Sequence, residues 1–296
     1  IKQQSDAHKA QYPIAVIVDS GCDLPDEVVD SLNIHVIPVK LNFGDVHYVD
    51  KVSLTSKEFW NELEKNPIHP QTSQPSPGDF RRQYQFLSSH YESAISIHIP
   101  EKASGTYQSA VTASKTVPKF PIEIKDSLNG SIGLGLIAMS AAEAIKKKHD
   151  FNEVSKIVEN AVENTTLFIG LKELNNVVKG GRISPKIKKV ANFFRINPIL
   201  TFNNQGIKPI GFTIGNNNKA KKFKKFVESK IPKNKNVRLG IAHAKMEEFA
   251  LNWSKNLRKD YVKENVVLTE VGPALGVHAG PGSLVFAIQV LDNGKH

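Results

Sequence analysis

Runs of apolar residues, each followed by a polar turn and an amphipathic segment, recur through the first half of the chain. The run IAVIV at residues 14–18 is continuously apolar, which is typical of a strand buried on both faces of a parallel sheet. Residues 34–41 predict a second strand, with Pro38 at an edge or a bulge, and residues 94–99 and 122–124 predict two more. Strands alternating with helices predict an α/β domain in which helices cover a parallel sheet.

In sheets of this kind, ligands bind at the carboxyl ends of the strands. Polar residues that follow the predicted strands, or that open the next helix, are therefore expected to lie together on the rim of a cleft. They are Asp19, Ser20, Thr72, Ser73, Ser104, Asp126 and Ser127.

The pattern changes near residue 165, where short strand-like segments with fewer long helices begin. These segments cover residues 167–171, 196–202, 207–214, 237–242, 266–270 and 284–290. They predict a second, mainly antiparallel α/β domain. We expect a tail or linker at residues 1–12, an amino-terminal domain at 13–164, a carboxyl-terminal domain at 165–296, and a ligand cleft between the two domains.

The stretch at residues 71–80 combines hydroxyl groups with two prolines directly before an amphipathic helix. Ser76 and Asp79 predict a capping box, and Pro77 suits the first helical position, where no N–H group is needed. Thr72 lies just outside this helix start, where free N–H groups and the positive end of the helix dipole favour a carboxylate. A well-capped loop that binds nothing is the alternative.

Two glycine-containing segments of the second half carry candidate polar groups. The segment KGGRIS at residues 179–184 places Arg182 on a Gly-Gly turn, which suits an exposed contact with a phosphate or a partner carboxylate better than the lining of an apolar tunnel. The segment GVHAGPG at 276–282 predicts a rigid loop that presents one titratable group, His278. An ordinary surface turn and a structural histidine are the alternatives.

The chain has 296 residues, 40% of them apolar, and one cysteine, Cys22. A single cysteine excludes an intramolecular disulfide and a cysteine-based zinc cluster, and it points to a reducing compartment. No apolar run approaches the roughly 18 residues of a spanning helix, and residues 1–11 contain no signal-peptide core. We therefore expect a soluble, cytoplasmic protein.

The net charge of +10 is concentrated around residues 179–189 and 219–230, which would suit an anionic partner. In the second cluster, Phe223, Phe226 and Val227 are interleaved with lysines, which favours a helix with one core stripe and a solvated basic face. No zinc-finger, RNP-type or basic-zipper signature accompanies the charge. Nucleic-acid binding is therefore a weak alternative.

The motifs, taken in order, resemble those of the DegV family of bacterial fatty-acid-binding proteins. The resemblance covers nearly everything from residue 14 to residue 288. Its motifs are Asp19-Ser20 with Asp23-Leu24-Pro25, TSQPSPGDF at 72–80, SGTYQSA at 104–110, Asp126-Ser127, KGGRIS at 179–184 and GVHAGPG at 276–282. The chain departs from the family pattern at Leu134 and Ala279, where polar residues are usual, so we expect fewer polar groups near the rim.

This resemblance implies a two-domain α/β carrier of one long-chain fatty acid, such as palmitate, with no cofactor, no metal and no catalytic activity. Thr72 and Ser104 would hold the carboxylate, with His278 close to the same head group, and the acyl chain would lie in the carboxyl-terminal domain. Arg182 would serve transfer of the acid to a separate fatty acid kinase, which makes an acyl phosphate. The resemblance thus places the protein in fatty acid metabolism and phospholipid synthesis.

The residues themselves agree with a carrier, because the chain lacks a G-x-x-x-x-G-K-[ST] phosphate loop, a protein-kinase signature and a G-x-S-x-G elbow. An enzyme alternative stays open from residue types alone. It is a serine acyl hydrolase with Ser104 or Ser127 as nucleophile, His278 as base and Asp126 as the group that orients it.

Overall fold

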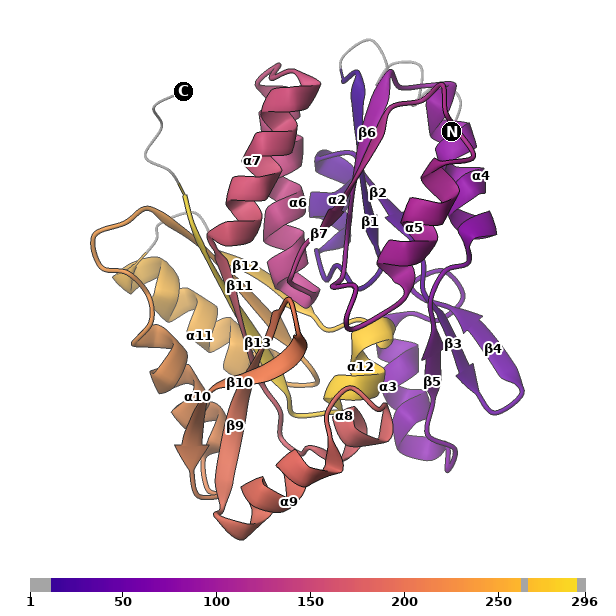
Figure 1. Ribbon diagram of the computed structural model, residues 1–296. Coiled ribbons are helices and arrows are strands. Elements are labelled where there is room, and N and C mark those ends of the chain that lie inside the picture. Colours follow the sequence, from indigo (N-terminus) through magenta and orange to yellow (C-terminus); the bar gives the residue numbers. More distant parts are fainter. Residues whose placement is uncertain (1–11, 262–265, 292–296) are drawn as a thin grey trace.

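The computed structural model describes residues 12–261 and 266–291, so most of the predicted tail at residues 1–12 lies outside the described residues. A parallel sheet of four strands, in the order β2-β1-β6-β7, forms the first half (Figure 1). Its strands are β1 (Ile14–Asp19), β2 (Ile34–Ile37), β6 (Ser93–His98) and β7 (Ile122–Asp126). Every residue of β1 and β6 is buried, which explains their apolar runs and confirms the parallel sheet predicted for this half.

Helices cover both faces of this sheet. On one face lie α4 (Pro77–Ser88) and α5 (Thr106–Ser114), and on the other lie α6 (Ser131–Lys146) and α7 (Phe151–Glu163). The start of α4 is as predicted, because the Ser76 hydroxyl accepts from the Asp79 amide and the Asp79 carboxylate accepts from the Ser76 amide. The capping box therefore fixes where the helix begins.

The second half forms a six-stranded sheet in the order β10-β9-β8-β13-β11-β12. It is antiparallel except between β11 and β12, which confirms the mainly antiparallel prediction. The strands are β8 (Thr165–Gly170), β9 (Ile196–Asn203), β10 (Gly206–Ile214), β11 (Val237–His243), β12 (Val266–Glu270) and β13 (Leu284–Val290).

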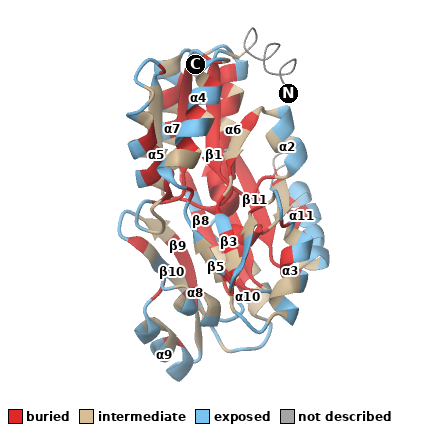
Figure 2. Ribbon diagram, turned by 90° about the vertical axis from the view of Figure 1, so that its right-hand side faces the viewer, coloured by how far each residue is buried: buried red, intermediate tan, exposed pale blue. Residues whose placement is uncertain are grey.

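Two helices, α10 (Lys219–Glu228) and α11 (Glu247–Asp260), cover the outer face of the six-stranded sheet. Trp253 of α11 stacks on Phe286 of β13 with ring centroids 4.9 Å apart. Phe223 and Val227 of α10 are buried, so the lysine-rich segment is the amphipathic helix that its sequence predicted. Figure 2 shows the buried residues gathered along the strands and the exposed ones along the outer helices.

Helix α6 lies between the two sheets and packs against both of them. Small residues permit this close approach: a Cβ at Gly133 would meet Leu167 of β8, and a Cβ at Gly240 of β11 would meet Ile132. One core therefore extends from β1 to β13 through α6. The domain boundary near residue 165 stays a prediction.

A third sheet was not predicted. It has three antiparallel strands, β3 (Lys40–Phe43), β4 (Val46–Val49) and β5 (Gln71–Ser73), in the order β4-β3-β5. The prediction of one strand over residues 34–41 is wrong, because the chain leaves the parallel sheet at Ile37 and enters this sheet at Lys40. Pro38, which has no N–H group for a sheet hydrogen bond, lies at that break.

The remaining helices are α2 (Asp26–Ser31), α3 (Ser56–Lys65), α8 (Asn175–Lys179), α9 (Pro185–Phe193) and α12 (Pro273–Ala279). Helix α12 lies near the centre of the molecule, beside α3 and α8 (Figure 1). The loop predicted at residues 276–282 is therefore partly wrong, since it begins as a helix and turns only at Gly280 and Gly282, with φ of 71° and 82°. Within the described ranges, no helix has both the length and the apolar character needed to cross a membrane.

Candidate functional site

A cavity of about 440 Å³ lies where the carboxyl ends of the parallel strands meet the six-stranded sheet and α12. Most of its wall is apolar and comes from the second half of the chain. Leu167, Ile169, Leu200, Phe202 and Val285 are examples from β8, β9 and β13. Such a cavity, within the volume range of small-molecule sites, can bury an extended apolar group.

The polar side chains of the cavity come from five separated segments. They are Thr72, Ser73, Gln74, Ser104, Ser131, Arg182 and His278. Among the residues that the structure describes, none of the side chains lining the cavity is acidic. These side chains present hydroxyl, amide, imidazole and guanidinium groups, which is a donor set suited to an anion.

Thr72 and His278 meet although 206 positions separate them, with Thr72 Oγ1 and His278 Nε2 3.2 Å apart. Thr72 is held by its place in β5, opposite Leu41 of β3, and His278 by its place in α12. His278 Nδ1 is buried and has no hydrogen-bond partner among the described residues.

His278 is a neutral imidazole near pH 7. Burial lowers its pKa to about 4, with smaller contributions from the positive charges of Arg182 and His69 nearby. A neutral imidazole can donate from one nitrogen and accept at the other. It can therefore orient the Thr72 hydroxyl without adding a charge to the site.

Ser104 lies just before α5. Its hydroxyl oxygen accepts from the Thr106 amide at 3.3 Å and lies 2.9 Å from Thr106 Oγ1. Gly105 is needed next to it, since a Cβ there would collide with the side chain of Gln74, which also lines the cavity. The turn at residues 104–107 therefore packs against the segment at residues 72–76, and this contact sets the position of the Ser104 hydroxyl.

Arg182 lines the cavity and is also exposed at its mouth. Its Nη1 donates to the Gly180 carbonyl at 2.6 Å, and burial of part of the side chain lowers the guanidinium pKa. Gly180 packs on the His278 ring, because a Cβ there would meet Nδ1. The expectation that Arg182 would lie outside the tunnel is therefore wrong, although its predicted exposure is found.

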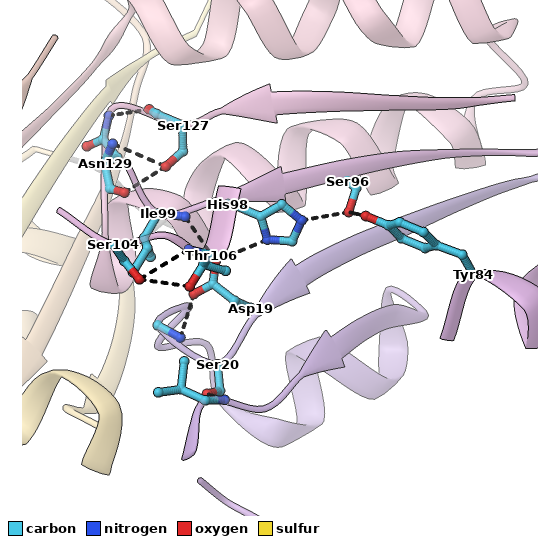
Figure 3. Close-up of polar contacts among 12 residues, drawn as sticks. Asp19, Ser20, Tyr84, Ser96, His98, Ile99, Ser104, Thr106, Ser127 and Asn129 are labelled. Atoms are coloured by element: carbon cyan, nitrogen blue, oxygen red, sulfur yellow. Dashed lines mark hydrogen bonds and ion pairs between the residues drawn. The ribbon is translucent and has the colours of Figure 1, made fainter. Parts of the chain in front are cut away.

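Two of the predicted rim residues, Asp19 and Ser20, are fully buried and do not line the cavity; Figure 3 shows Asp19 pointing to His98 and Ile99. Asp19 accepts from the amides of Gly21 and Ile99, both at 2.9 Å, and its Oδ2 lies 3.1 Å from His98 Nδ1. Ser20 accepts from the Val39 amide at 2.9 Å. Both side chains hold the turns around the site rather than facing the cavity.

Asp126 and Ser127 are likewise absent from the lining and hold the turn after β7. Asp126 accepts from the amides of Leu128 and Glu101 at 2.8 and 3.1 Å. The Ser127 hydroxyl donates to the Asn129 carbonyl at 2.6 Å, as Figure 3 shows. Across the described part of the chain, no serine is hydrogen-bonded to His278, and Asp126 does not orient it. The predicted hydrolase constellation is therefore not assembled.

Ser131 lines the cavity but is not predicted from the sequence, because its φ of 50° and its position at the start of α6 have no local signature. Leu134 does not thin the rim, because it is buried in the core of α6, whereas Ala279 does line the cavity. Nowhere in the described residues do three His, Cys, Asp or Glu side chains gather as a metal site would require.

Comparison with known proteins places the chain in one family. The model of the DegV family, which describes its members as uncharacterised proteins, matches residues 13–291. A DegV domain-containing protein of Staphylococcus aureus strain COL is 32% identical over 269 residues, which cover 91% of this chain and 96% of that protein.

Solved structures of the same family share the fold. DegV of Bacillus subtilis, a fatty acid binding protein, is 27% identical with a TM-score of 0.86, covering 95% of this chain and all of that one. A DegV family protein of Thermus thermophilus, described for its fatty acid binding, is 25% identical with a TM-score of 0.84, covering 94% and 100%.

The lowered pKa of His278 predicts a pH-dependent loss of stability. The imidazole of His278 has an ordinary pKa near 6.5 in the unfolded state and a pKa of about 4 in the folded state. Its contribution to the free energy of unfolding is therefore fully present above pH 6.5 and is lost as the pH falls towards 4. Between pH 7 and pH 4, the wild type should lose up to about 3 kcal/mol more unfolding free energy than His278→Gln. Urea unfolding at both pH values measures this, and equal losses in the two proteins would contradict it.

Proposed function

The chain belongs to the DegV family, and from this premise we propose that it binds one long-chain fatty acid, with the acyl chain in the cavity and the carboxylate at Thr72, Ser104 and His278. One observation carries the proposal: a largely apolar cavity is also lined by neutral and cationic polar groups, of which Thr72 and His278 meet, and by no acid. A fatty acid has the matching chemistry, an extended apolar chain with one anionic end.

The acyl chain would supply most of the binding free energy. Removing each CH₂ group from water contributes about 0.8 kcal/mol, so a long chain needs few polar contacts for tight binding. The apolar wall formed by β8, β9 and β13 would receive the chain. The polar groups would then set the direction in which the fatty acid enters and which end it presents.

Hydroxyl groups suit the carboxylate because they can donate hydrogen bonds to it. With the imidazole proton on His278 Nε2, that nitrogen donates to Thr72 Oγ1, and the Thr72 hydroxyl hydrogen is free for the ligand. Ser104 is equally free when Thr106 Oγ1 donates to it. The Arg182 guanidinium at the mouth adds a positive charge on the side from which a partner would approach.

We further propose that the protein is a non-catalytic carrier that presents this carboxylate to a separate fatty acid kinase. The position of Arg182 supports the role, because one side chain both lines the cavity and reaches the surface. An arginine there can pair with the carboxylate or with a phosphoryl group as it is added. The carrier would then serve fatty acid metabolism.

Purified protein should carry one long-chain fatty acid from its expression host, since the buried apolar chain makes dissociation costly. Native mass spectrometry followed by solvent extraction measures this directly. If no lipid is extracted, and added palmitate neither binds nor raises the midpoint of thermal unfolding, the carrier proposal fails.

Thr72→Val and Ser104→Ala should each weaken palmitate binding about tenfold or somewhat more, since hydrogen bonds to a charged acceptor contribute roughly 1.5–3 kcal/mol. Isothermal titration calorimetry measures the affinities. Thr112→Val is the matched control, because this threonine is exposed on α5 and outside the cavity. Unchanged affinity in the Thr72/Ser104 double variant would exclude the proposed head-group contacts, and a large loss of thermal stability would show that the hydroxyls are chiefly structural.

Arg182→Ala should separate binding from transfer. Because Arg182 reaches the cavity, we expect a loss of palmitate affinity of a few-fold, whereas acyl-phosphate formation with a cognate kinase and ATP should fall far more steeply. Lys189→Ala, an exposed lysine of α9 outside the cavity, should behave like the wild type. Wild-type rates from Arg182→Ala would remove the transfer role, and acyl phosphate made without any kinase would overturn the carrier assignment.

A further inference from the structure

A buried ionic cluster lies at the end of α12 opposite His278. Asp23 Oδ1 accepts from the amide of Gly272, the residue that precedes α12, at 2.9 Å. Asp23 Oδ2 accepts from the Ser131 hydroxyl at 2.7 Å, and Ser131 lines the cavity. One carboxylate thus connects the start of α12 with the start of α6.

The cluster contains two buried carboxylates and one cation. Lys51 Nζ lies 3.8 Å from Asp23 Oδ1 and donates to the Cys22 carbonyl at 3.0 Å. Asp50 is 1% exposed, and neither of its carboxylate oxygens has a hydrogen-bond partner within the described ranges. The Ser20 hydroxyl and the Ala274 amide lie beyond hydrogen-bond distance of Asp50 but close enough to favour its ionised form, so Asp50 is the weakly held member of the cluster.

The groups around Asp50 come from several elements. Burial raises its pKa to about 7, the Ser20 hydroxyl, Lys51 and the Ala274 amide lower the pKa, and Asp23 raises it. Two further charges act on the cluster: Asp19, the last residue of β1, raises the pKa of Asp23, and Asp26, the first residue of α2, raises the pKa of Lys51. The buried Cys22 thiol has a raised pKa and stays protonated. Geometry places Asp50 at the same end of α12: its amide donates to the carbonyl of Val39, which lines the cavity, and a Cβ at Gly272 would meet the side chain of Lys51, the next residue.

Helix α12 connects this end of the helix with the cavity. Ala274, Leu275, His278 and Ala279 all line the cavity, and a Cβ at Gly276 would collide with Phe59 of α3. The helix is about 10 Å long, at 1.5 Å per residue. A small displacement of its first turn would therefore move the cavity wall and the imidazole that orients Thr72.

Local backbone geometry ties the cluster to its present arrangement. Lys51 and Ser131 have φ of 60° and 50°, a left-handed conformation that non-glycine residues adopt only when the surroundings hold it. Both side chains contact Asp23. A change of charge within the cluster therefore acts on two strained turns as well as on α12.

We propose that Asp50 is a positioning residue for ligand binding, which stabilises the fatty-acid-binding arrangement of α12 when it is neutral and weakens it when it is ionised. The proposal rests on the proposed fatty-acid binding. An ionised Asp50 attracts the Ala274 amide and the Ser20 hydroxyl, and so draws the first turn of α12 towards itself. It also adds a buried negative charge to that of Asp23. This charge lies about the length of α12 from the ligand carboxylate and disfavours binding of the anion.

Palmitate affinity measured at pH 6, 7 and 8 tests this. Between pH 6 and pH 8 the wild type should lose roughly fivefold in affinity. A repulsion between two negative charges one helix length apart is of this size at the effective dielectric constants of proteins. Asp50→Asn, which stays neutral, should show only the pH dependence that the titration of palmitate brings. Asp45→Asn, at an exposed aspartate between β3 and β4, should follow the wild type. The ratio of variant to wild-type affinity cancels the titration of palmitate itself.

Identical pH profiles for the wild type and Asp50→Asn would overturn the proposal, whereas failure of the wild type to bind palmitate at any pH would overturn the proposed function instead. If Asp50→Asn does not fold, carbon-13 NMR of the Asp50 carboxyl in the wild type decides the question. Because coupling is reciprocal, palmitate should raise the pKa of this carboxyl, and an unchanged pKa would exclude Asp50 from ligand binding.

Discussion

The close packing of α6 between two sheets is the constraint on which the rest of the structure depends. Gly133 and Gly240 let the helix approach the six-stranded sheet to a distance at which a Cβ would collide with Leu167 or Ile132. The helix fills the space between the two sheets along its length. The cavity lies at the start of the helix, where Gly130 and Ser131 line it. The ligand cavity is thus the part of the interface between the sheets that α6 does not occupy.

Helix α12 closes this space and connects the buried ionic cluster at Asp23 with the polar groups around His278. Its amino-terminal end is held by Asp23 through the Gly272 amide, and its carboxyl-terminal end places His278 against Thr72. Tight contacts with α3 and α8 leave room only for glycine at positions 276 and 280. A short helix held at both ends can position one imidazole accurately, which a flexible glycine loop would not do.

Polar residues around the site have two different roles. Asp19 and Asp126 accept hydrogen bonds from the backbone amides of neighbouring turns, so they stabilise the turns that border the site. The cavity is lined instead by polar residues of other segments, Thr72, Ser104 and His278 among them. Keeping acids out of the lining and inside hydrogen-bonded turns makes the cavity suitable for an anion.

The sequence by itself determined the α/β class, the parallel first sheet, the antiparallel second one and the capped start of α4, because these depend on side-chain periodicity and on neighbours a few positions apart. It also pointed to Thr72, Ser104, Arg182 and His278 through ordered motifs. Only the tertiary structure decided that β3 pairs with β5, that Asp19 and Ser127 turn away from the cavity, and that Thr72 meets a histidine 206 positions later. The reason is physical: which face of a turn a side chain presents depends on the backbone amides and close contacts that distant segments bring to it, and no local pattern records them.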